Sequence, residues 1–185
     1  MGLFYSISDK KLLEIRNKIF NEKGIPALEK NEFKQSPFST SWYGKDDLGG
    51  YSYEFCRLSK DSHLQLLFVD IIKGDRWIQI HLNIFKLLPE LNSIAQLQGL
   101  SGLQYHLPPN SLGKMRLRID DYKGIPLFRT KEHRLKSFNT ENGLKLRVRQ
   151  LEKLIEKDLQ NIDSFIERWH ELHQPNLTDW EGNKS

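Results

Sequence analysis

Cysteine and long apolar runs are what this 185-residue chain has least of. Its single cysteine, Cys56, excludes a disulfide within the chain and is typical of a reducing compartment. The longest apolar run, residues 64–72, contains Asp70 and is too short to cross a bilayer. No basic segment followed by an apolar one marks a secretion signal at the N-terminus. We therefore expect a cytoplasmic protein with no membrane association.

The common motifs of catalysis and metal binding are also missing. The chain has no G-x-S-x-G, no P-loop and no G-x-G-x-x-G. His170 and His173 share a helix face, but their spacing is not that of the H-E-x-x-H zinc proteases. We expect no metal ion and no cofactor, and we expect Cys56 to be a buried, inert thiol. The loose myristoylation pattern M-G-x-x-x-S leaves lipidation of Gly2 open.

Three consecutive segments rich in β-branched and aromatic residues predict an antiparallel meander. They are residues 51–58, 63–72 and 77–85. Each connection between them holds four turn-forming residues, which suits a hairpin. Residues 115–119 alternate strictly between apolar and basic side chains, which predicts a fourth strand with Arg116 and Arg118 on one face.

Helices are expected at both ends of the chain. Ser8 is a good N-cap for the first helix, and Gly24 followed by Pro26 predicts its end. Apolar residues recur at helical spacing over about residues 143–173. Such a helix would be about 45 Å long, so we expect it to protrude, to bend or to pair with a second copy of the chain.

The predicted fold class is therefore α+β. A meander of three to four antiparallel strands is flanked by the N-terminal helix and the long C-terminal helix. The length and the apolar content are typical of one domain. We assign residues 1–175 to that domain and residues 176–185 to a polar, frayed tail.

The hairpin turns also predict a register for the sheet. Opposing Leu58 to His63, and residue 72 to residue 77, places Tyr51, Asp70 and Gln79 in one row, with His81 diagonal to Asp70. An Asp–His pair on a concave face can transfer protons. Tyr51, Asp70 and His81 are thus weak catalytic candidates. Without a nucleophile, a hydrogen-bonded polar patch is the favoured interpretation.

The strongest functional signal is a basic segment at residues 114–149. It holds eleven Lys and Arg against four acids, a net charge of +7, although the whole chain carries only +4. Such a block on a nearly balanced body indicates an anionic partner, or a solvated surface. The candidate binding residues of the segment are Arg116, Arg118, Lys123, Arg129, Lys131, Arg134 and Arg147.

A second candidate surface is the glycine-rich stretch 42–50, interpreted as a flexible loop. Trp42 and Tyr43 stand beside Asp46 and Asp47, an arrangement that resembles an interface anchor with an acidic rim. The alternative is that both aromatic side chains fold back onto the core. The sequence favours neither.

These features favour a non-catalytic intracellular protein-binding module, comparable with adaptors or immunity proteins, that docks an acidic partner through a basic surface. The first alternative is a nucleic-acid-binding protein that contacts phosphates through residues 114–149. The second alternative is an enzyme that uses the Tyr/Asp/His cluster. A homodimer through the C-terminal helix is also possible, because its apolar stripe serves a second copy as well as an internal core.

Overall fold

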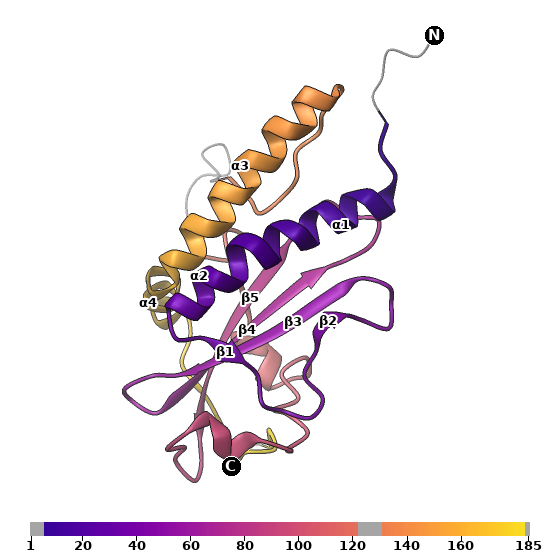
Figure 1. Cartoon of the computed structure of the whole chain (residues 1–185). Coiled ribbons are helices and arrows are strands. Elements are labelled where there is room, and N and C mark those ends of the chain that lie inside the picture. The colour runs from indigo at the N-terminus through magenta and orange to yellow at the C-terminus, as the bar shows by residue number, and fades with distance from the viewer. Residues whose placement is uncertain (1–5, 122–130, 184–185) are drawn as a thin grey trace.

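A sheet of seven strands lies at the centre of the computed structural model, which describes residues 6–121 and 131–183 (Figure 1). The strands are β1 (Lys34–Gln35), β2 (Tyr43–Lys45), β3 (Tyr51–Leu58), β4 (His63–Ile71), β5 (Gln79–Leu87), β6 (Met115–Arg116) and β7 (Asn176–Thr178). The central path runs β1-β3-β4-β5-β6 in antiparallel pairs, while β2 adds to β3 and β7 adds to β5 in parallel. The predicted α+β class with an antiparallel sheet is confirmed.

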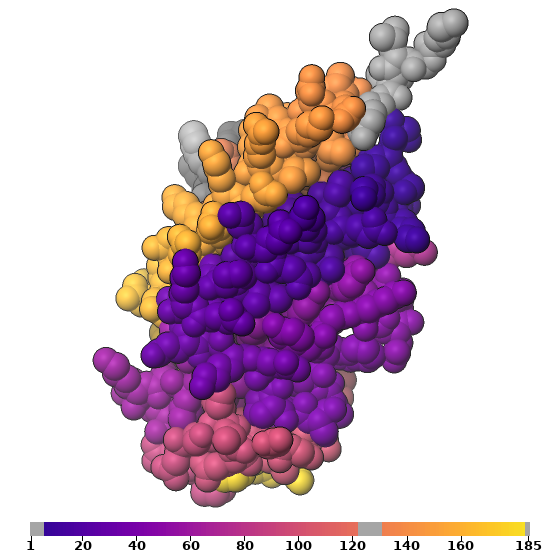
Figure 2. Space-filling view, viewed as in Figure 1, coloured from indigo at the N-terminus to yellow at the C-terminus, as the bar shows by residue number. Residues whose placement is uncertain are grey.

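One face of the sheet is covered by helices (Figure 1). They are α1 (Asp9–Ile19), a π-helical turn (Phe20–Gly24), α2 (Ile25–Lys30), α3 (Glu141–Gln160) and α4 (Ile162–Leu172). Figure 2 shows α3, in orange, lying along α1, in indigo. The main core lies between this helical layer and the sheet, where alternate residues of β3, β4 and β5 are buried together with the apolar sides of α1 and α3.

The first helical segment does not stop at Gly24, contrary to the prediction. Gly24 has an ordinary right-handed φ of −74°, and the chain passes through the π-helical turn directly into α2. A Cβ on Gly24 would lie 2.4 Å from a ring carbon of Phe20. The glycine therefore makes room for a buried ring, and Pro26 lies in the first turn of α2.

The long C-terminal helix is present but bends. Asn161 separates α3 from α4, and its side-chain amide donates to the carbonyl of Lys157 at 2.7 Å. The bend brings Trp169 of α4 into the core, where its indole N–H donates to the carbonyl of Gly113 at 2.6 Å. Because Leu151 and Ile155 of α3 are also buried in the main core, the apolar stripe is used within the chain.

Loops and the C-terminal segment cover the other face of the sheet. A second core around Leu66, Phe68 and Phe85 lies beneath residues 88–113, which include short 3-10 helices at Ile94–Leu97 and Asn110–Gly113. Residues 176–185 were predicted to be a frayed tail. Instead β7 pairs with β5, and the indole N–H of Trp180 donates to the carbonyl of Pro89 at 2.6 Å.

The register of the sheet is as predicted between β4 and β5 but wrong between β3 and β4. Asp70 pairs with Gln79, as expected, whereas Leu58 pairs with Leu64 rather than with His63. Five residues, 59–63, lie between the paired Leu58 and Leu64, whereas the predicted pairing of Leu58 with His63 left four. Ser62 in this loop adopts a left-handed φ of 57°. A shift of one residue moves every side chain of β3 to the opposite face of the sheet.

Candidate functional site

The predicted row of Tyr51, Asp70 and Gln79 does not form, because the shift of β3 carries Tyr51 to the helical face. Ser52 takes its place and donates from its hydroxyl to Asp70 at 3.0 Å. His81 stays on the loop face of the sheet, but burial, with Lys114 and Arg116 nearby, lowers its pKa to about 3. The structure thus offers a neutral histidine without the predicted tyrosine.

The basic segment is divided between the interior and the surface. Arg118 points inward and binds both carboxylate oxygens of Asp158, with Nη2 to Oδ1 at 2.6 Å. His133 Nε2 lies 2.7 Å from Oδ2 of the same carboxylate, and Asp158 is only 3% exposed. The chain turns after Arg116, and Arg118 adopts a φ of 63°, so the two arginines do not share a strand face as predicted.

Two other arginines of the segment enclose an aromatic ring. The guanidinium of Arg116 lies 4.5 Å from the ring centroid of Trp77, and that of Arg134 lies 5.2 Å from it. Trp77 is partly exposed and pairs with Arg134 in an isolated β-bridge. Nη2 of Arg116 is buried and has no hydrogen-bond partner in the part of the chain that the structure describes.

Arg134 also lines a shallow depression against α3, together with Lys136, Arg147 and one acid, Glu132. We call Trp77, Arg116, Arg134, Lys136 and Arg147 the basic edge. It brings together three predicted binding residues that are far apart in the sequence. Sequence reasoning missed Trp77, since only the strand register and the bridge to Arg134 place its ring there.

The remaining predicted basic residues do not join this surface. Lys131 is exposed, and its carbonyl accepts a hydrogen bond from Arg118 at 3.2 Å. Lys123 and Arg129 lie outside the described residues.

The 42–50 stretch is more regular than predicted, because residues 43–45 form β2. Trp42 directly precedes this strand and Tyr43 begins it, and alternation along the extended chain sends the two aromatic side chains apart. Tyr43 packs edge-on against Tyr53 and Phe55, with ring centroids 5.4 and 5.5 Å away, although it remains 40% exposed. Trp42 is 39% exposed and lines a hollow on the loop face of the sheet. Asp46 accepts from the N–H groups of residues 48 and 50, so this acid closes the turn.

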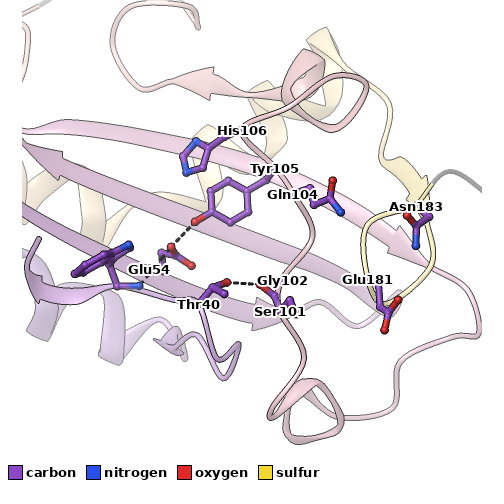
Figure 3. A pocket seen from close by; sticks show the side chains of 10 residues that line it. Thr40, Glu54, Ser101, Gly102, Gln104, Tyr105, His106, Glu181 and Asn183 are labelled. Carbon is purple, nitrogen blue, oxygen red and sulfur yellow. Dashed lines mark hydrogen bonds between the residues drawn. The ribbon is translucent and has the colours of Figure 1, made fainter. Parts of the chain in front are cut away.

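This hollow, here called the Glu54 hollow, has a volume of about 470 Å³ (Figure 3). Its lining residues are Thr40, Trp42, Glu54, Ser101, Gly102, Gln104, Tyr105, His106, Glu181 and Asn183. Figure 3 shows Tyr105 pointing at Glu54, and Glu181 and Asn183 on a separate loop across the opening. Three segments distant in the sequence thus surround one carboxylate.

Glu54 is the buried acid of the hollow. It is 6% exposed, and burial raises its pKa even though Tyr105, Ser41 and the backbone of Trp42 donate to it. The Ser41 hydroxyl lies at 2.7 Å and the Trp42 nitrogen at 3.4 Å from the carboxylate oxygens. Sequence reasoning missed Glu54. The available signal was one acid amid the apolar residues of β3, and its partner Tyr105 comes from a distant loop.

Cys56 is fully buried, and burial raises the pKa of its thiol to about 12, in agreement with an inert cysteine. Within the described residues, no group of three His, Cys, Asp or Glu side chains is arranged to hold a metal ion. No helix there is long and apolar enough to span a membrane. Comparisons with protein-family models, with curated proteins and with solved structures find no match to this chain.

Proposed function

We propose that this protein is a non-catalytic binding module that docks an acidic protein through its basic edge. The observation that carries the proposal is the approach of two guanidinium groups, those of Arg116 and Arg134, to the ring of Trp77. Lys136 and Arg147 line a depression together with the same Arg134. Tryptophan and arginine are the residues most enriched among the energetic centres of protein interfaces. A partly exposed ring held by two cations is therefore a suitable anchor.

The chemistry of arginine supports a carboxylate-bearing partner. A guanidinium binds a carboxylate through two parallel hydrogen bonds, and stacking on an aromatic ring holds its plane in place. Burial lowers the pKa of Arg116 although the carboxylates of Asp120, Asp75 and Glu132 act to raise it, so a further anion would reduce the cost of its charge.

A protein partner is favoured over nucleic acid because some cations of the basic segment are already paired with acids of the chain. Binding to a nucleic-acid backbone requires many free cations along the path of the phosphates. In the described part of the segment, Arg118 is bound to Asp158, and Lys145 pairs with Glu141 at 2.7 Å. Among the cations that remain in the described residues, Arg116 and Arg134 lie against one aromatic ring, which suits a localised acidic patch.

The test is fluorescence anisotropy with a labelled peptide of alternating acidic and apolar residues. We expect the double variant Arg134→Glu/Arg147→Glu to bind roughly tenfold more weakly than the wild type, because two attractive charges become repulsive. The matched control is Lys30→Glu/Lys60→Glu, which makes the same change of net charge at exposed positions away from the basic edge. Equal losses in the two variants would contradict the proposal.

Random-sequence single- and double-stranded nucleic acids provide the second arm of the same experiment. If they bind more tightly than the peptide, with an affinity that falls linearly on a log–log plot against salt, the alternative of phosphate contacts replaces the proposal.

A further inference from the structure

We propose that the Glu54 hollow binds an organic cation, specifically a guanidinium or a primary amine at the end of an aliphatic chain. The proposal concerns the loop face of the sheet and does not depend on the basic edge. It stands on the cavity, the charge of its walls and the aromatic side chains beside it.

The charge of the lining is opposite to that of the whole molecule. The chain carries a net charge of +4, yet the residues that line the hollow include the carboxylates of Glu54 and Glu181 and neither lysine nor arginine. His106 is the other titratable group besides Tyr105, and burial together with Lys114 lowers its pKa, which keeps the imidazole neutral. The walls therefore attract a positive charge.

The aromatic groups of the hollow suit the same ligand. Trp42 is 39% exposed at the wall, and an indole face is the best aromatic partner of a cation in proteins. Tyr105 stacks on Phe68 with ring centroids 3.6 Å apart, which fixes its ring beside Glu54. A ligand with an aliphatic stem and a cationic head can contact the rings along its length and the carboxylate at its end.

The hollow is also held in shape before any ligand arrives. The Glu54 carboxylate is fixed by its three donors, and the hydroxyl of Thr40 donates to the carbonyl of Ser101 across the wall. Gly102 and Gln104 adopt left-handed backbone angles, with φ of 100° and 48°, so the wall follows a path that few residues tolerate. A preformed site loses less entropy on binding.

The size of the hollow limits the ligand to a small group. A volume of about 470 Å³ falls within the range of small-molecule sites in proteins. Such a cation has two sources: a free amine, or the side chain of arginine or lysine in a peptide. Both present the same head group, so the experiment must separate them.

The experiment is isothermal titration calorimetry of the full chain with four probes at neutral pH. The probes are agmatine, arginine, the neutral isostere citrulline and a blocked tripeptide with a central arginine. We expect agmatine or the tripeptide to bind with a dissociation constant below about 1 mM, and citrulline at least tenfold more weakly. The tighter of the two cations identifies the source as free or peptide-borne.

Two variants and a control locate the binding. Trp42→Ala and Glu181→Gln change side chains that are not buried, and each should weaken the binding roughly fivefold. Glu90→Gln removes an exposed carboxylate outside the hollow and should leave the affinity unchanged. Equal binding of citrulline and arginine, or no heat with any probe up to 10 mM (about tenfold above the expected constant), would overturn the proposal.

Discussion

Asp158 holds two partners in a place that solvent hardly reaches. Burial alone would raise its pKa, but hydrogen bonds from Arg118 and His133 outweigh burial and lower it. The carboxylate joins α3 to two residues, Arg118 and His133, of the connection between β6 and α3. At the scale of the single residue, it is a buried carboxylate shared by two side chains that stand far from it in the sequence.

Replacing this carboxylate should therefore be costly. We expect Asp158→Asn to lower the free energy of unfolding at pH 7 by about 3 kcal/mol, because the Arg118 guanidinium loses its counter-charge while still half-buried. Urea denaturation followed by circular dichroism measures the loss. Asp47→Asn, at an exposed position, is the control and should change the stability by less than about 0.5 kcal/mol.

The same comparison has a defined pH dependence. A carboxyl whose pKa is lowered on folding stabilises the protein above its unfolded pKa, near 3.9, and loses this contribution as the pH falls through the folded value. The difference between the wild type and Asp158→Asn should therefore be constant from pH 7 to about pH 5 and shrink below about pH 4. A difference that does not change down to pH 2.5, about 1.4 units below that unfolded value, would show that the charge of Asp158 is not its source.

At the scale of the element, the continuous helical path from α1 into α2 depends on the absence of a Cβ at Gly24. Glycine within a helix usually costs about 1 kcal/mol relative to alanine. Gly24→Ala should have the opposite sign here and destabilise the protein by about 1–3 kcal/mol, since the new Cβ meets the buried ring of Phe20 at 2.4 Å. Thermal unfolding decides the sign, and a stabilised variant would contradict the packing role.

The elements also show how far sequence patterns reach. The strands β3, β4 and β5 lie within two residues of their predicted ranges, because the alternation of apolar side chains is a local property. The register of β3 was wrong because it depends on the conformation of Ser62, which a turn composition does not determine. The stop predicted at Gly24 was wrong because packing against Phe20 explains the glycine equally well.

The same limit applies to the candidate sites. The basic residues of the edge could be named from composition, but Trp77 joins them only through its bridge to Arg134. Glu54 and Tyr105 stand 51 positions apart, and nothing in either local sequence links them. Local patterns locate the elements, whereas a site assembled from several elements requires their packing.

At the scale of the whole molecule, the last residues of the chain hold the loop face together. The carbonyl of Gly182 accepts from Asn110 at 2.8 Å, and a Cβ on this glycine would lie 2.3 Å from the carbonyl oxygen of Leu103. Trp180 packs against the second core. Residues 176–183 therefore belong to the folded body rather than to a tail.

Removing residues 176–185 should reveal this dependence. We expect the shortened chain to lose about 3 kcal/mol of stability, or about 10 °C in melting temperature, through the loss of β7 and of the Trp180 packing. Differential scanning calorimetry of the two chains gives the shift. A melting temperature within 2 °C of that of the full chain, a change of about 1 kcal/mol or less, would show that the segment contributes little.

The Glu54 hollow has a consequence for how its occupant can be found. Its walls come from segments around Thr40, Glu54, Tyr105 and Glu181, so the cavity exists only while the chain is folded. Any compound that enters it must shift the folding equilibrium toward the native state, by an amount that grows with its concentration relative to its dissociation constant. The melting temperature of the protein is therefore itself a detector, and a library of small amines can be ranked by heating alone.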